Sequence, residues 1–78
     1  MPVRRSVADS AALLRSDAEA VEHAAARLRA LIDRLRDDPA TPPWFISIAE
    51  AHITAASTAA TDLATAAAHL NTLSGAES

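Results

Sequence analysis

The sequence has no cysteine, a single glycine and only two aromatic residues, and these shortages exclude several classes of protein. Without cysteine there is no disulfide framework, thiolate zinc site or cysteine nucleophile, so packing or self-association must hold these 78 residues together. A single glycine cannot build a glycine-rich phosphate loop. No apolar run approaches the roughly 18–20 residues of a membrane span, and no signal-peptide core follows Arg4 and Arg5. We expect one domain, residues 1–78, in the cytoplasm.

Positive charge is also scarce. Seven arginines, with no lysine, stand against ten acidic residues, so the net charge is −3. All the arginines lie within residues 1–38, where seven acids balance them, and the rest of the chain carries only acids among its charged groups. Affinity for the phosphate backbone of nucleic acids comes from surplus positive charge. We therefore expect no duplex DNA partner, and a small DNA-binding regulator is disfavoured.

The sequence is instead rich in alanine arranged with helical periodicity. Half of the residues are apolar, and most of these are alanine, the strongest helix former. Ser6 and Asp9 match the S-x-x-[DE] capping box, which predicts a helix start near Val7 and a helix over about residues 7–37. Two series with seven-residue spacing mark its apolar seam. They are Val7, Leu14, Val21, Leu28 and Leu35, and Ala11, Ala18, Ala25 and Ile32.

Three of the four prolines cluster at Pro39, Pro42 and Pro43 and predict a loop over 38–42. Thr41 is a candidate cap, and a proline in the first helical turn costs no hydrogen bond. We expect the second helix to span about residues 43–73, with Gly75 as a left-handed cap beyond its end. Its apolar positions form two stripes, which implies two sets of neighbours. The second stripe contains Phe45, Ile48, Ala55, Ala59, Ala66 and Leu73.

These elements predict an all-α fold, an antiparallel two-helix hairpin. A loop of about five residues makes the two helices antiparallel neighbours. A lone hairpin buries only one face of each helix, which leaves too little apolar area to offset the conformational entropy lost on folding. We therefore expect copies of the chain to assemble into a homo-oligomeric helical bundle, most simply four helices from two hairpins.

The arginines are candidate anion ligands because a guanidinium can contact phosphate or carboxylate through two hydrogen bonds. Arg4 and Arg5 precede the helix cap and have no acidic neighbour closer than Asp9, so they are the better candidates. The other arginines have acidic residues at helical spacing and predict ordinary solvated pairs. The expected pairs are Asp33 with Arg36 or Arg29, and Asp17 or Glu19 with Arg15.

The three histidines do not predict a metal site. His52 and His69 lie seventeen residues apart, roughly 25 Å along one helix, so they cannot share an ion within a chain. No H-x-x-x-H or E-x-x-H motif occurs, and helices this regular offer neither a strained nucleophile turn nor an oxyanion hole. We expect no metal, no cofactor and no enzymatic activity.

Trp44 and Phe45 open the second helix directly after the proline pair. One interpretation is that they plug the end of the bundle, and the other is that they form a stacking platform for a base or peptide. His52 likewise has two interpretations, a packed residue of the apolar stripe or a ligand contact.

The stretch 44–54, preceded by residues 31–35, resembles the hairpin domain of phage-encoded anti-CBASS and anti-Thoeris sponge proteins. In that pattern an aromatic residue opens the second helix, isoleucine and alanine follow three and four residues later, and histidine follows seven residues later. The matching residues here are Phe45, Ile48, Ala49 and His52. The resemblance implies a symmetric oligomer that sequesters cyclic oligonucleotide immune signals between protomers without cleaving them.

Two positions depart from that pattern. Glu22 stands where the family has a lysine and Asp62 where it has an arginine, and no ring lies near the start of the first helix. A relative with these departures is expected either to bind a different ligand or to bind phosphate through Arg4, Arg5 and Arg15 instead. Trp44, His52 and Thr54 would then contact the bases or sugar.

Two functions remain open from the sequence. The first is non-enzymatic capture of a cyclic di- or trinucleotide by an oligomeric hairpin. The alternative is a protein–protein interaction module, an antitoxin-like or scaffold hairpin without a small-molecule ligand, whose second helix docks a partner helix.

Overall fold

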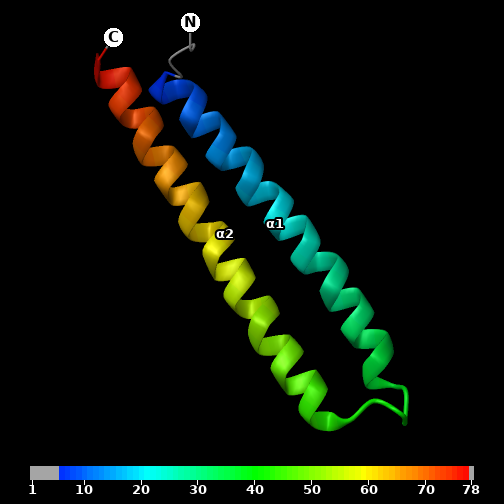
Figure 1. Ribbon diagram of the computed structural model, residues 1–78. Helices are drawn as coiled ribbons and strands as arrows, with labels where there is room; N and C mark the ends of the chain where they lie inside the picture. Colours follow the sequence, from blue (N-terminus) through cyan, green and yellow to red (C-terminus); the bar gives the residue numbers. More distant parts are fainter. Residues whose placement is uncertain (1–5, 78) are drawn as a thin grey trace, which may run out of the picture.

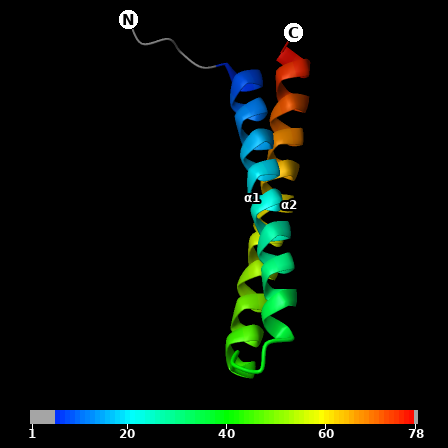
Figure 2. The ribbon, with the colours of Figure 1, turned by 90° about the vertical axis from the view of Figure 1, so that its right-hand side faces the viewer.

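The computed structural model describes residues 6–77, which form two long helices packed side by side as an antiparallel hairpin (Figure 1). Helix α1 spans Val7–Arg36 and helix α2 spans Pro43–Glu77. The hairpin measures 58 × 26 × 15 Å, so it is a single layer of helices with two broad faces. The start of α1 and the end of α2 lie at one end of the layer, and the loop closes the other (Figure 2). The all-helical hairpin predicted from the sequence is confirmed.

Helix α1 begins where its capping signal predicts. The backbone N–H of Asp9 donates to Ser6 Oγ at 3.0 Å, and Ser6 itself has extended backbone angles. This bond satisfies one of the amide donors that a helix start leaves without an intrahelical partner. At the other end α1 stops at Arg36, one residue before the expected end, and Asp37 is its C-cap.

The connecting segment is a compact turn built around Asp38. Its Oδ1 accepts the backbone N–H of Ala40 at 2.9 Å, and its carbonyl accepts the N–H of Thr41 at 3.0 Å. Aspartate commonly stabilises turns by accepting such local bonds. Helix α2 then begins at Pro43, as expected, and the N–H of Phe45 donates to the Pro42 carbonyl in the first turn.

The predicted end of α2 is wrong. The helix does not stop near Leu73 but continues through Gly75 to Glu77, and no described residue has a positive φ, so Gly75 is not a left-handed cap. One glycine inside a helix costs only about 1 kcal/mol, and no proline follows to stop the helix. Three threonines of α2 bond to the carbonyl four residues earlier, which satisfies their hydroxyls within the helix. They are Thr61, Thr65 and Thr72.

The core between the helices is built largely from alanine. Its members are Ala11, Ala18, Ala25, Ile32, Ile53, Ala60 and Ala67. Of the two seam series predicted for α1, only the series that runs from Ala11 to Ile32, which we call the alanine series, is fully buried. The residues of the other series are half-buried or exposed, and Leu28 is one of the exposed residues. Alanine is buried where the backbones approach most closely because a methyl group leaves room for the opposing helix.

Large side chains enter the core only near the loop. Ile32 of α1 and Ile53 of α2 form a cluster with Ala25, and Leu35 and Ile46 pack against it. The two buried series have the same seven-residue step and run in opposite directions, so each layer of one helix meets a layer of the other. This register determines which residues flank the core on each broad face.

Candidate functional site

The two broad faces of the hairpin have different chemistry. On one side of the α1 core, the positions four residues after each buried residue carry charged side chains. They are Arg15, Glu22, Arg29 and Arg36. Four residues of α2 lie on the same side: Glu50, Thr54 and Thr61 line grooves together with these α1 residues, and Ser57 is hydrogen-bonded to Arg29. We call this side the polar face.

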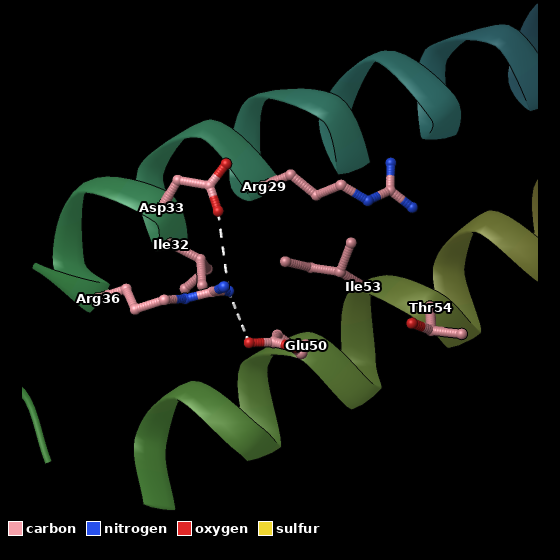
Figure 3. Close-up of a pocket in the computed structure, with 7 residues that line it drawn as sticks. All are labelled: Arg29, Ile32, Asp33, Arg36, Glu50, Ile53 and Thr54. Atoms are coloured by element: carbon pink, nitrogen blue, oxygen red, sulfur yellow. Dashed lines mark hydrogen bonds and ion pairs between the residues drawn. The ribbon is translucent and has the colours of Figure 1, made fainter. Parts of the chain in front are cut away.

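The polar face is bridged across the helices near the loop (Figure 3). Nη2 of Arg36 donates to Oε1 of Glu50 at 2.7 Å and lies 3.7 Å from Oδ1 of Asp33, so its guanidinium sits between two carboxylates. About two turns earlier along α1, Nη2 of Arg29 donates to Ser57 Oγ at 2.7 Å. The groove between these bridges has a volume of about 160 Å³, with Ile32 and Ile53 beneath it.

This polar groove has no surplus positive charge. Arg36 has two acidic partners, and Nη1 of Arg29 lies 3.9 Å from Oε1 of Glu22. The side chains of these ion pairs are about half exposed, so each pair contributes at most about 1 kcal/mol. A phosphate entering the groove would have to displace carboxylates that already occupy both guanidinium groups. The arrangement ties the helices together and is not a preformed anion site.

The opposite side of the core is apolar, and we call it the apolar face. On α1 its members are Leu14, Val21, Leu28, Leu31 and Leu35. On α2 they are Phe45, Ala49, His52, Ala56, Leu63 and Leu70. The positions one and two heptads before Leu31 are Ala24 and Asp17, so the apolar face is widest near the loop.

An open groove of about 260 Å³ lies on this wide part of the apolar face. Leu28, Leu31 and Leu35 line it from α1, and Phe45, Ala49, His52 and Ala56 line it from α2. Its floor is the buried pair Ile32 and Ile53, which therefore separates it from the polar groove on the other side. Among the described residues that line it, His52 is the only one with an ionisable side chain. Such a groove can accept an apolar surface or ring but provides little polar recognition.

The structure does not bring the candidate ligand residues together within one chain. His52 lines the apolar groove, Thr54 lines the polar groove near the loop, and Arg15 lines a third groove with Glu19 and Glu22 nearer the middle of the hairpin. Arg4 and Arg5 lie outside the described residues. A binding site that used all of these side chains would need residues from more than one chain.

Within a single chain, Trp44 does not cover the core at the loop end of the hairpin. Its side chain is 64% exposed and meets Phe45 edge-on, with ring centroids 6.3 Å apart and an interplanar angle of 78°. Phe45, by contrast, reaches the apolar groove. Within one chain Trp44 therefore presents a largely exposed indole beside the loop, and both the end plug of a bundle and the stacking platform remain predictions.

Sequence reasoning missed the bridges across the two helices. Arg36 does pair with Asp33 on its own helix, as expected, but its shorter contact is with Glu50, and Arg29 pairs with Glu22 and Ser57 rather than with Asp33. The signal was present, because Arg29 and Arg36 follow the buried series of α1 with the same seven-residue step. Among residues 6–75, whose side chains the structure describes, no three His, Cys, Asp or Glu side chains are grouped as a metal site. Neither helix, over its described length, is long and apolar enough to cross a bilayer.

Comparisons with known protein families, with curated proteins and with solved structures find no match for this chain. The likeness to the sponge hairpins therefore has no independent support.

Proposed function

We propose that this chain acts by binding and not by catalysis, as a self-associating helical hairpin that serves as a protein interaction module. The observation that carries the proposal is the apolar groove of Leu28, Leu31, Leu35 and Phe45, which lies open on one face of a single helical layer. Contiguous exposed apolar surface on a small protein marks a place where another molecule packs. The polar face, closed by its own ion pairs, offers no comparable surface.

Sedimentation of the purified chain over a wide range of concentrations tests this proposal. A self-associating module should sediment with a mass that rises above the 8.1 kDa of one chain as the concentration increases. A well-folded chain that stays at 8.1 kDa at every concentration would contradict self-association.

We retain capture of a cyclic di- or trinucleotide as a second candidate function because of one observation. Three of the four residues that carry the family resemblance, Phe45, Ala49 and His52, line the same groove. Phe45 would stack on a base and His52 would hydrogen-bond to it, while phosphate contacts would come from arginines outside this groove. Such a site would be completed between protomers, because none of the arginines in the described part of the chain lines the groove.

Thermal unfolding with a panel of cyclic di- and trinucleotides distinguishes the two candidates. A ligand of the native state present at 100 times its Kd should stabilise the protein by about 2.7 kcal/mol. The replacement Phe45→Ala should abolish the shift, whereas the control Ile48→Ala, outside the groove, should retain it. If no cyclic nucleotide of the panel shifts the thermal stability, nucleotide capture is refuted and the interaction module is the one candidate function that stands.

A further inference from the structure

We infer that the apolar face is covered by a second copy of this chain, and that the assembly closes at two hairpins and four helices. This inference rests on the proposed self-association and specifies its surface, its partner and its stoichiometry. Three features carry it: the surface left exposed by one chain, the position of the apolar side chains, and the charge of the opposite face.

The exposed surface of one chain is too large for an independent globular monomer. Its accessible surface is 5877 Å², whereas a folded monomer of 8.1 kDa exposes about 4,500 Å². Its radius of gyration is 17.6 Å, compared with about 11.5 Å for a compact domain of this length. The excess surface is more than about 1,000 Å² per chain. Two copies that buried this excess would share an interface above about 2,000 Å², which is the range of obligate homodimers.

Three of the eight large apolar side chains that are exposed in the described part of the chain lie together where such an interface would form. Leu28, Leu31 and Phe45 are exposed in the single chain, and all three line one groove. The apolar face extends from there along both helices through half-buried residues such as Leu14, Leu63 and Leu70. A second hairpin laid on this face would supply the missing layer of a four-helix bundle. A short apolar peptide would cover only the groove and leave the rest of this face exposed.

The chemistry of the polar face limits the assembly to two copies. Arg29 and Arg36 have acidic partners there, and these charged groups are about half exposed to water. A third hairpin packed on this face would have to desolvate several charged groups, which costs more than their mutual attraction returns. Of the two broad faces of the hairpin only one is apolar, and pairing two copies through this face buries it in both. The interface is therefore isologous and closed.

The decisive experiment compares two leucines of α1 with nearly equal exposure. Leu31 is 46% exposed and lines the apolar groove, whereas Leu13 is 43% exposed and lies outside it. Sedimentation velocity of the full chain should give the mass of two copies for the wild type and for the control Leu13→Glu. Leu31→Glu places an unpaired carboxylate in the interface of both copies, so the dimer dissociation constant should rise at least about a hundredfold. Circular dichroism of each variant monitors the helix content.

A second variant keeps the inference testable if Leu31→Glu fails to fold. His52→Leu replaces the one ionisable side chain lining the groove with an apolar one, so it should lower the dimer dissociation constant several-fold. A weaker dimer for His52→Leu would overturn the assignment of this face.

The remaining outcomes separate the inference from the proposed function. If Leu31→Glu and Leu13→Glu both remain dimers of equal affinity, the chain self-associates through another surface and only the inference fails. A wild-type chain that remains a folded monomer would refute both. A wild-type assembly larger than two copies would overturn the closed dimer but would leave self-association standing.

Discussion

Replacing Ile53 with alanine tests the core at one of its few large side chains. Ile53 is only 6% exposed, whereas Ile48 on the same helix is 52% exposed, so the two isoleucines form a matched pair. The same three carbon atoms are removed at both sites, and the gain in helix propensity from alanine is the same and cancels in the comparison.

The expected loss in the free energy of unfolding at each site follows from the burial of its side chain. Three carbons at about 0.8 kcal/mol each give about 2.4 kcal/mol of lost transfer free energy at the buried site and about half of that at the exposed one. Ile53→Ala also leaves a cavity, but Ile53 lies between two open grooves, so neighbouring side chains can relax into the space. We expect Ile53→Ala to lower the free energy of unfolding by about 2.5–3 kcal/mol and Ile48→Ala by about 1 kcal/mol.

Urea unfolding followed by circular dichroism measures both values. The two variants and the wild type must be compared at one protein concentration, because self-association would add concentration-dependent stability. Equal losses at the two sites, or a larger loss for Ile48→Ala, would refute the placement of Ile53 in the core between the helices.

Three further predictions concern the helix ends and the polar face. Ser6→Ala should lower the free energy of unfolding by about 1 kcal/mol because it removes the acceptor of the Asp9 N–H, and Ser6→Asp should restore most of the loss in the same urea assay. A double-mutant cycle of Arg36→Ala and Glu50→Ala should give a coupling energy of about 0.2–1 kcal/mol that shrinks in high salt, and a coupling unaffected by salt would contradict a solvent-exposed pair. Gly75→Ala should raise the free energy of unfolding by at most about 0.5–1 kcal/mol, and with it the thermal midpoint, because an added Cβ meets no atom within 4 Å. A lower midpoint would indicate a left-handed Gly75.

The sequence by itself determined the elements and their order. The capping serine, the proline cluster and the seven-residue series are local signals, because each acts on residues near it in the sequence. They therefore specify the start of α1, the loop and the start of α2 without reference to the rest of the fold. The same local reasoning failed at Gly75. Glycine permits a left-handed cap but does not enforce one, and the helix-forming residues around it continue α2 to Glu77.

Only the tertiary structure decided which residues meet across the hairpin. The sequence offered two seam series in α1, and the relative rotation of the two helices selects the alanine series for the core and leaves Leu28 exposed at its edge. His52 and Thr54 are two residues apart and so point to opposite sides of α2, and the rotation decides that His52 reaches the apolar face and Thr54 the polar face. Periodicity along one helix defines a set of faces, but the face that becomes buried depends on how closely two backbones can approach, which is a property of both helices together.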